Sequence, residues 1–492
     1  MNMKQYLACD LGAESGRVML GELEGGKVRL HELHRFPSAA VRIAGSLRWD
    51  VLKIHEELVE GLRKAGKLGV KASGVSADSW GVDYVLLKEG EPFLAVPYHY
   101  RDARTDDGFE RVFAKVDAET VFEETGIQFM TLNTIFQLND DVERRKALLD
   151  FSDGFLNIAD AINFYFSGVG RAEESLASTT QLYNPRMRQW SSLLAEKLGI
   201  PSAIYPEIVP SGTVLGPLLP ELAENTGLKN CQVIATCSHD TAAAIAAIPA
   251  STEPGWAYLS SGTWSLLGIE SQTPVINAKS RELNFTNEAG YGGTTRFLKN
   301  IIGLWIIQEC RREWAREGRE LDYNEITVMA EQAEPLRSLI YPNSPRFNKP
   351  GGMPARIADY CRETGQPVPE SPGAFVRCVL ESLALLYRQT ISELEDASGQ
   401  TINRLHIVGG GSRNRLLNQF SANATRLPVL SGPVEATAIG NILIQALALG
   451  DLKSLAELRN VVAESFPPEK FVPQETEIWE SAFDKFRSLP IE

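Results

Sequence analysis

The chain carries one local pattern twice. Residues 6–24 contain an apolar run, a turn with glycine and serine, and a second run of alternating polarity, which predicts two strands joined by a turn. Residues 256–270 repeat this order, and the turn glycines Gly12 and Gly262 lie 250 positions apart. We therefore expect two versions of one domain, whose facing hairpins could grip a phosphate chain from both sides.

A segment that contains Pro, Ser and Thr, IPASTEPG at residues 248–255, separates the two copies. A chain of 492 residues is long enough for two large domains. The sequence thus predicts an N-terminal domain over residues 1–247 and a C-terminal domain over residues 256–492.

Strand and helix signals alternate along the chain, which favours an α/β fold. Asp50 is expected to cap a helix that extends to about residue 65, with Leu52 and Leu58 on its buried face. Residues 372–396 show the same helical spacing of apolar side chains.

The charge balance excludes one class of partner. Lys and Arg number 49 against 63 Asp and Glu, so the formal net charge is −14. Nucleic-acid affinity comes largely from basic side chains, so a nucleic-acid partner is not expected. A small phosphorylated ligand is compatible with this charge, because backbone amides and Mg²⁺ can override it locally.

The cysteines and the apolar segments predict a cytoplasmic protein with no membrane partner. The N-terminus reaches Asp10 before an apolar segment long enough for a signal peptide. The apolar stretch 436–450 is interrupted by Asn441 and Gln445 and is too short for a bilayer. The six cysteines form no CxxC pair, which indicates neither a zinc site nor a disulfide framework.

The first candidate site is DLGAESGR at residues 10–17. Its glycines allow main-chain N–H groups to turn toward an anion, and Asp10 at a strand end suits an Mg²⁺ ion held mostly through water. The segment matches neither the Walker motif nor the dinucleotide fingerprint. An ordinary hairpin entry, with Asp10 capping a turn, is the alternative.

The second candidate site is Ser238-His239-Asp240-Thr241, between a strand at 232–236 and an alanine-rich helix. Open α/β sheets bind ligands at such strand ends. An aspartate with an ordinary pKa of about 3.9 is ionised at neutral pH, so Asp240 could accept a proton from an attacking hydroxyl. Alternatively, Asp240 or Ser238 is only a helix cap and His239 a packing residue.

Two later segments could also contact a ligand. The triplet at 409–411 follows a strand and precedes a helix, where glycines let a backbone approach an adenine or a phosphate. The segment LKNIIGLWIIQ is expected to be one helix, with Asn300 and Gln308 on one face about 12 Å apart. Such a helix could touch two ligands placed end to end, or it could be a core helix.

Taken in order, eight segments resemble the rhamnulokinases, carbohydrate kinases of the actin-like ATPase superfamily. They are DLGAESGR, DSWGVDYVLL, SHDTAAA, YLSSGTWSLLGIES, LKNIIGLWIIQE, CRETGQPVPE, LHIVGGGSRNRLLNQ and GPVEATAIGN, and the resemblance extends from about residue 6 to residue 450. It implies an α/β fold of two ribonuclease H-like domains that flank a catalytic cleft. It also implies ATP-dependent phosphorylation of L-rhamnulose at its 1-hydroxyl, in L-rhamnose catabolism, with Mg²⁺ as cofactor.

The resemblance assigns roles to individual residues. Asp240 would be the proton acceptor, and the sugar would contact Gly81, His239, Asp240, Thr241 and Asn300. ATP would contact Ala13, Glu14, Ser15, Gly16, Arg17, Thr263, Gln308 and Gly410. Asp10 would contact the hydrated Mg²⁺ ion.

Several points stay open. Some relatives carry a close cysteine pair where Ser421 and Thr425 stand here, whereas Cys361 and Cys378 match a pair that can be bridged in the family. The substrate could instead be another ketose such as L-fuculose or L-ribulose. The chain could also be a non-catalytic, actin-like ATP-binding protein. Its oligomeric state is not predicted.

Overall fold

The computed structural model describes residues 3–38, 40–94, 96–250 and 255–491. The chain divides into two compact units, each assembled from separate segments. Unit 1 contains Met1–Ser251, Glu270–Phe297 and Ala436–Phe466, and unit 2 contains Thr252–Ile269, Leu298–Glu435 and Pro467–Glu492. The expected domain boundaries at residues 247 and 256 stay a prediction, and part of the predicted linker lies outside the described residues.

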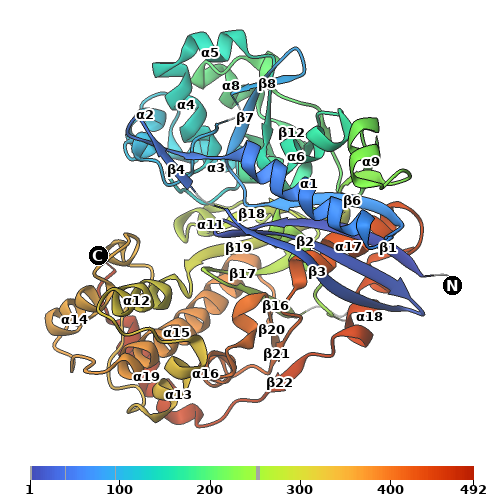
Figure 1. Ribbon diagram of the computed structural model, residues 1–492. Helices are drawn as coiled ribbons and strands as arrows, with labels where there is room; N and C mark the ends of the chain where they lie inside the picture. The colour runs from blue at the N-terminus through green and yellow to red at the C-terminus, as the bar shows by residue number, and fades with distance from the viewer. Residues whose placement is uncertain (1–2, 39, 95, 251–254, 492) are drawn as a thin grey trace. The chain divides into compact units, whose positions relative to one another are not determined.

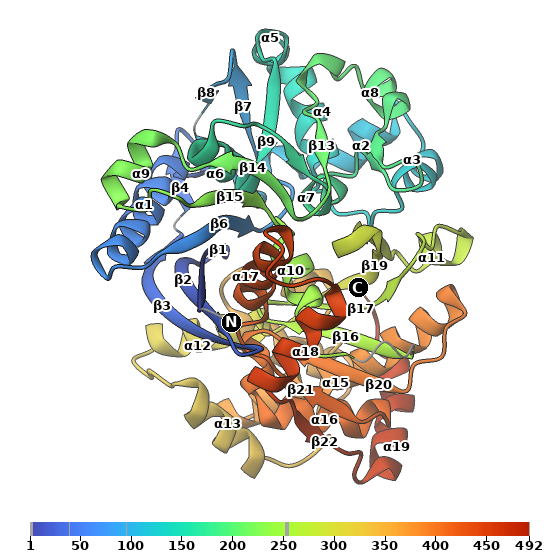
Figure 2. The same cartoon turned by 90° about the vertical axis from the view of Figure 1, so that its right-hand side faces the viewer.

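Unit 1 is built on a six-stranded sheet in the order β14-β15-β6-β1-β2-β3. Figure 1 labels β6, β1, β2 and β3 of this sheet, and Figure 2 labels all six strands. Its strands are β1 Lys4–Leu11, β2 Ser15–Glu24, β3 Lys27–Pro37, β6 Ala72–Ser79, β14 Thr213–Pro217 and β15 Gln232–Ala235. The predicted N-terminal hairpin is confirmed, because β1 and β2 pair antiparallel. Strands β1 and β15 both run parallel to β6, so the carboxyl ends of these three strands meet at one edge.

Helices cover both faces of this sheet because side chains of β1 alternate between two cores. Leu7 and Cys9 pack with α1 (Val51–Lys67) and α6 (Ile158–Ser167). Tyr6 and Ala8 pack with α10 (Asp240–Ala246), α17 (Ala436–Ala448) and α18 (Leu455–Ser465) on the other face. In Figure 2, α10 and α17 lie side by side over this second face.

The predicted helix after Asp50 is confirmed as α1, and the Asp50 side chain accepts a hydrogen bond from Lys53 N. Leu58 is buried as expected, but Leu52 is 58% exposed and its predicted burial is wrong. Leu52 is the second residue of α1, and in this first turn its side chain faces solvent.

The remaining elements of unit 1 are short. Four small sheets or hairpins pair β4 with β5, β8 and β9 with β7, β10 with β13, and β11 with β12. The strands are β4 Ala40–Ile43, β5 Ser46–Trp49, β7 Tyr84–Lys88, β8 Glu91–Leu94, β9 Gly154–Asn157, β10 Ala172–Glu173, β11 Tyr183–Asn184, β12 Gln189–Trp190 and β13 Ile208–Val209. The helices are α2 Gly108–Phe113, α3 Ala118–Thr125, α4 Thr134–Arg144, α5 Lys146–Phe151, α7 Glu174–Thr179, α8 Ser192–Leu198, α9 Pro220–Thr226 and α11 Ala278–Glu282.

A second large sheet has the order β18-β19-β17-β16-β20-β21-β22, and most of it belongs to unit 2. Its strands are β16 Trp256–Ser261, β17 Trp264–Ser271, β18 Thr286–Ala289, β19 Thr295–Ile302, β20 Arg404–Val408, β21 Val429–Ser431 and β22 Glu469–Phe471. The second predicted hairpin is confirmed as β16 and β17, which pair antiparallel, and β16 runs parallel to β20.

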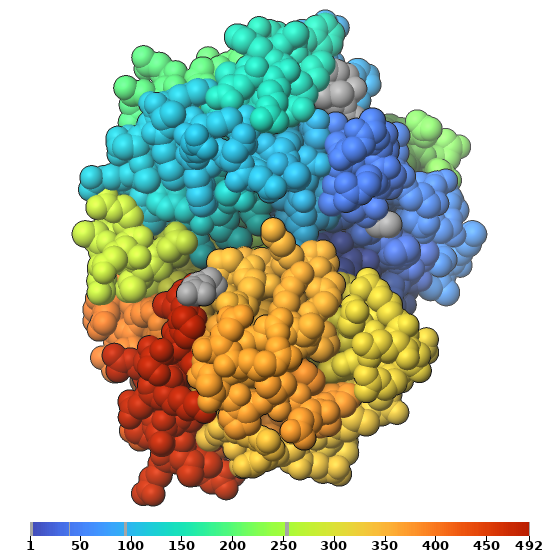
Figure 3. Space-filling view, turned by 90° about the vertical axis from the view of Figure 1, so that its left-hand side faces the viewer, coloured from blue at the N-terminus to red at the C-terminus, as the bar shows by residue number. Residues whose placement is uncertain are grey.

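The helices of unit 2 pack around this sheet. They are α12 Trp305–Arg316, α13 Tyr323–Gln332, α14 Met353–Glu363, α15 Pro372–Ser398, α16 Arg415–Thr425 and α19 Thr476–Arg487. The predicted long helix at 372–396 is confirmed as α15. The C-terminal helix α19, drawn in red, lies at the surface beside the orange residues of this unit (Figure 3). Among the described residues, no helix is both long and apolar enough to cross a bilayer.

The expectation that residues 298–308 form one helix is wrong. Asn300 lies in strand β19, and Gln308 lies in helix α12 beyond Gly303. A Cβ on Gly303 would lie 2.7 Å from the carbonyl carbon of Trp264 and 2.8 Å from the carbonyl oxygen of Gly262. The chain therefore turns at Gly303 where it passes the β16–β17 hairpin, and the two amides do not share a helix face.

Candidate active site

Three chain segments converge at the carboxyl ends of β1, β6 and β15. Asp10 lies opposite Asp78 in the parallel register of β1 and β6. Beyond β15, Ser79 N donates a hydrogen bond of 2.9 Å to Ser238 O, and His239 forms a bridge with Ser79. The structure therefore brings Asp10, the Ser238–Thr241 segment and the loop that contains Gly81 to one edge of the sheet.

Asp240 is the first residue of α10 rather than its cap. The cap is His239, whose side chain makes no capping hydrogen bond, so the alternative that Asp240 or Ser238 is only a helix cap is wrong. The Asp240 side chain is 33% exposed, and its Oδ1 accepts hydrogen bonds from Thr241 N at 2.5 Å and Thr241 Oγ1 at 3.1 Å. One carboxylate oxygen is thus fixed by its neighbour while the group stays open to a ligand.

The electrostatic setting of Asp240 differs from the sequence expectation. Burial raises the pKa of Asp240, the negative charge of Asp10 raises it further, and His239 opposes the shift. Its pKa therefore lies above the ordinary value, and the expectation of an ordinary pKa is wrong. A raised pKa makes the carboxylate a stronger base toward a hydroxyl proton.

Asp10 and Asp78 form a pair of carboxylates that suits a hydrated Mg²⁺ ion. Asp10 is ion-paired with Arg17 across the β1–β2 hairpin. Asp78 is fully buried; its Oδ2 accepts a hydrogen bond of 2.6 Å from Asn441 Nδ2, and its Oδ1 has no hydrogen-bond partner among the described residues. Burial and the charge of Asp10 raise the pKa of Asp78 well above its usual range.

The donor set fits an ion that keeps much of its water. No cluster of three or more His, Cys, Asp or Glu ligands occurs in the part of the chain that the structure describes. Mg²⁺ is commonly bound through one or two carboxylates together with substrate phosphates and waters. The two carboxylates at this strand edge match that kind of site.

The loop between β1 and β2 uses its glycines for packing. Gly12 N donates a hydrogen bond of 3.0 Å to Ser15 O and so closes the turn. A Cβ on Gly16 would overlap the ring of Phe36. Neither glycine has a positive φ. The more accessible part of the predicted ATP segment is therefore Ala13, Glu14 and Ser15 rather than buried Gly16.

The loop that contains Gly81 rests on a buried polar network. Asp83 Oδ2 accepts hydrogen bonds from Trp49 Nε1 at 2.6 Å, Trp80 Nε1 at 3.0 Å and Tyr100 N at 3.1 Å, while Oδ1 accepts from Gln137 Nε2 at 3.0 Å. Burial raises the pKa of Asp83 to about 6 although these four donors oppose the shift. Asp83 thus anchors the side chains of Trp49 and Trp80 beside the loop that contains Gly81.

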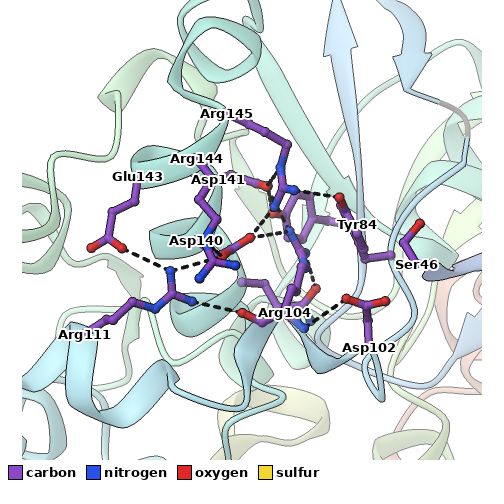
Figure 4. A network of polar contacts seen from close by, with 12 residues as sticks. Ser46, Tyr84, Asp102, Arg104, Arg111, Asp140, Asp141, Glu143, Arg144 and Arg145 are labelled. Atoms are coloured by element: carbon purple, nitrogen blue, oxygen red, sulfur yellow. Dashed lines mark hydrogen bonds and ion pairs between the residues drawn. The ribbon is translucent and has the colours of Figure 1, made fainter. Parts of the chain in front are cut away.

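This network continues into α4. Gln137 accepts a hydrogen bond of 2.7 Å from buried Arg104, and Arg104 donates to Asp141 at 2.8 Å. Figure 4 shows Arg104, Arg111 and Arg145 gathered around the adjacent carboxylates of Asp140 and Asp141. The carboxylates neutralise the guanidinium groups, which makes the cluster a support for the loop rather than an anion site.

We expect Asp83→Asn to lower the free energy of unfolding by about 2–3 kcal/mol. Both oxygens of Asp83 face donors, so the amide NH₂ of asparagine must meet a donor whichever way it points. Urea unfolding measures the change. Asp117→Asn is the matched control, because asparagine retains the capping bond that Asp117 accepts from Thr120 N, and it should change stability by less than about 0.5 kcal/mol. Equal stability of the two variants would contradict this role of Asp83.

In unit 2, three predicted ATP contacts lie close together. Gln308 Nε2 donates a hydrogen bond of 3.2 Å to Thr263 Oγ1 in the β16–β17 turn, and Gln308 Oε1 is buried without a hydrogen-bond partner among the described residues. A Cβ on Gly411 would overlap Ser261 Oγ, and one on Gly409 would lie 3.0 Å from Ser261 O. A Cβ on Gly410 would meet no atom within 4 Å. The outer glycines therefore pack on the hairpin while Gly410 faces open space.

The predicted site residues are divided between the units. Unit 1 holds Asp10, Ala13, Glu14, Ser15, Gly16, Arg17, Gly81, His239, Asp240 and Thr241, whereas unit 2 holds Thr263, Asn300, Gln308 and Gly410. Thr241 is 6% exposed, and Asn300 is half-buried in β19. Asn300 is thus the one predicted sugar contact that belongs to unit 2.

Sequence reasoning missed a buried carboxylate that holds the Ser238–Asp240 segment. Glu173 Oε2 accepts hydrogen bonds from Ser238 N at 2.9 Å and Ser175 Oγ at 2.5 Å, and Ser175 Oγ accepts one from His239 N at 3.1 Å. Nothing near Glu173 in the sequence marks it, because Ser238, which it holds, follows 65 residues later. The sequence analysis also did not single out Asp78, although its place at the end of a strand, like that of Asp10, could have marked it.

Cys361 in α14 and Cys378 in α15 are buried free thiols in contact with each other. The hydrogen bond between the two thiols lowers the pKa of Cys361 and raises that of Cys378. The pair that can be bridged in the family is thus reduced in this structure.

Two family models match the chain. Residues 5–247 match the N-terminal domain and residues 257–449 the C-terminal domain of the FGGY family of carbohydrate kinases. A rhamnulokinase from Bacteroides thetaiotaomicron is 41% identical over 487 residues, which cover 99% of this chain and 99% of that protein. A rhamnulokinase from Enterococcus faecalis is 42% identical over 469 residues, which cover 95% of this chain and 94% of that protein.

Solved structures show the same fold at low identity. The ligand-bound xylulose kinase from Lactobacillus acidophilus has a TM-score of 0.81 at 15% identity, with 98% of this chain and 97% of that chain covered. The glycerol kinase from Plasmodium falciparum with ADP has a TM-score of 0.79 at 16% identity, with 100% of this chain and 99% of that chain covered.

Proposed function

The chain belongs to the FGGY family of carbohydrate kinases and to its rhamnulokinase branch, and we propose that it transfers the γ-phosphoryl group of ATP to the 1-hydroxyl of L-rhamnulose. The products are L-rhamnulose 1-phosphate and ADP. The resemblance to this family is confirmed, and so is the expected two-domain α/β sugar-kinase fold. The assignment of the sugar is based on the similar rhamnulokinases, and the assignment of the reaction type is based on Asp240.

One observation carries the reaction type: a partly exposed carboxylate with a raised pKa stands at the end of β15, with His239 and Thr241 beside it. In the transfer, the sugar oxygen forms a bond to the γ-phosphorus and the bond from this phosphorus to the bridging oxygen of ADP breaks. Asp240 accepts the proton that the hydroxyl loses. Phosphoryl transfer depends mainly on the positioning of the reactants and on charge neutralisation. The protein therefore needs to supply only one well-placed base for the proton transfer.

The remaining site residues bind rather than react. We propose that His239, Thr241, Gly81 and Asn300 contact the sugar, and that Ala13, Glu14, Ser15, Gly16, Arg17, Thr263, Gln308 and Gly410 contact ATP. The free carbonyl oxygen of Gln308 and the open space at Gly410 support the second assignment. When bound, Mg²⁺ would neutralise phosphate charge, and Asp10 with Asp78 would hold its waters.

We also propose that the protein works in the cytoplasm. All six cysteines are buried free thiols, which is the state that a reducing compartment maintains.

An ADP-release assay with a panel of ketoses tests the proposal. We expect the highest kcat/KM with L-rhamnulose, and a lower kcat/KM with L-fuculose, L-ribulose and xylulose. A higher value for another ketose would make the sugar assignment wrong. ATP binding without turnover of any ketose would favour the non-catalytic, actin-like alternative.

A further inference from the structure

The ring of His239 lies between Asp240 and a buried ion pair. Its Nε2 is 3.5 Å from Asp240 Oδ1. Its Nδ1 is 3.0 Å from Arg296 Nη2 and 3.3 Å from Glu288 Oε2. Arg296 and Glu288 are themselves paired at 3.0 Å. Nε2 therefore faces Asp240, whereas Nδ1 faces both members of the Arg296–Glu288 pair, and all four residues belong to unit 1.

Arg296 has little freedom to move. Its side chain is 0% exposed, and its Nε donates a hydrogen bond of 3.1 Å to Ala289 O. Glu288 and Arg296 lie on β18 and β19, which are linked by only five residues, 290–294. The position of the guanidinium is thus set by the short connection between β18 and β19. It does not depend on the Ser238–Thr241 segment, which the guanidinium contacts.

The contact with Arg296 decides which ring nitrogen of His239 carries the proton. A guanidinium has no acceptor, and the Nη2–H group points at Nδ1. Nδ1 must then be the acceptor, and the proton of the neutral ring is on Nε2. Burial raises the pKa of Glu288, but the charge of Arg296 opposes this and the net shift is downward, so Glu288 remains the ionised partner of Arg296.

We propose that Arg296 is a positioning residue that fixes His239 as an Nε2–H donor directed toward Asp240 and the substrate oxygens beside it. A donor at this place suits the reacting sugar hydroxyl. Its oxygen can accept a hydrogen bond from His239 Nε2 while its proton passes to Asp240. Arg296, Glu288 and Asp240 are the charged groups around the ring. The proposal rests on the proposed function for the identity of its substrate. Which ring nitrogen of His239 carries the proton can nevertheless be tested without turnover.

The first test is ¹⁵N NMR of the whole protein labelled at its six histidines, with His239→Gln to assign the signal. We expect an acceptor-type resonance for Nδ1 and an N–H resonance for Nε2. A proton on Nδ1 would overturn the proposal, because Glu288 and not Arg296 would then orient the ring.

The second test replaces the ion pair as a unit with R296M/E288M. Removing both partners avoids a buried unpaired charge, which would unfold the chain for an unrelated reason. We expect kcat/KM for L-rhamnulose to fall about 10- to 100-fold, the scale of losing a charge-assisted hydrogen bond. KM for ATP should change less than about threefold. Arg296→Lys keeps a charged donor and should give a kcat/KM between the wild type and the double variant.

The matched control is R377M/E381M, which removes another largely buried Arg–Glu pair, joined at 2.7 Å within α15 of unit 2. We expect this control to keep kcat/KM within about threefold of the wild type. A loss in the control equal to that in R296M/E288M, or no loss in R296M/E288M, would overturn the positioning role. If wild-type protein phosphorylates no ketose, the proposed function fails, while the NMR result still decides the state of His239.

Discussion

Asp240→Asn is expected to lower kcat by about 100-fold or more, which is the scale of losing a general base. The substitution keeps the size of the side chain and the oxygen that accepts hydrogen bonds from Thr241 N and Oγ1. Only the ability to accept a proton is removed. ATP binding should stay near the wild-type affinity, because the clustered ATP contacts Thr263, Gln308 and Gly410 belong to unit 2.

Stopped-flow or steady-state turnover with L-rhamnulose measures the change, and nucleotide titration measures the retained affinity. Asp50→Asn is the matched control: Asp50 also stands at a helix N-terminus, and its acceptor role toward Lys53 N is retained by asparagine. The control should keep kcat within about twofold of the wild type. A near-native kcat in Asp240→Asn would remove Asp240 from the role of base.

The parts of the site that are local in sequence could be predicted. The strand at 232–235, the polar turn and the start of α10 follow one another directly, so the position of Asp240 at a strand end follows from the chain order alone. The same holds for the hairpins that carry Gly12 and Gly262. In each case the sequence pattern and the structure that it predicts lie within about twenty residues of the chain.

The error at residues 298–308 has a different cause. An apolar run with one glycine is compatible with a helix or a strand, and periodicity alone does not separate them. What decides is the approach of Gly303 to Gly262 and Trp264, which are about forty residues away in the chain. The same kind of contact packs Gly16 beneath Phe36.

The supports of the site could not be predicted because their partners are distant in the chain. Asp78 meets Asn441 from 363 positions away, and His239 meets Arg296 from 57. The sequence marks Asn441 as a polar interruption of the apolar stretch 436–450 and as part of the segment GPVEATAIGN, which the resemblance uses as a family motif without a physical reason. The structure supplies that reason: the part of this segment from Ala436 begins α17, which packs on α10 and donates to Asp78 through Asn441.

Gly440→Ala is expected to lower the free energy of unfolding by about 3 kcal/mol, the upper part of the range for overpacked cores. Helix propensity alone predicts the opposite, because alanine is favoured over glycine inside a helix by about 1 kcal/mol. In this fold, however, a Cβ on Gly440 would overlap the main-chain carbonyl of Ala243 in α10. A main-chain atom within a helix cannot turn aside, so α10 and α17 would have to separate.

Because α10 begins at Asp240, the same separation should also lower kcat. Urea unfolding and turnover of Gly440→Ala measure the two effects together. Gly170→Ala is the matched control, since its added Cβ would lie 3.6 Å from Leu156 and 3.7 Å from Phe164, which are ordinary contacts. It should change stability by less than about 0.5 kcal/mol. A Gly440→Ala protein more stable than the wild type would show that propensity outweighs the close approach, and that α17 does not set the position of the catalytic helix.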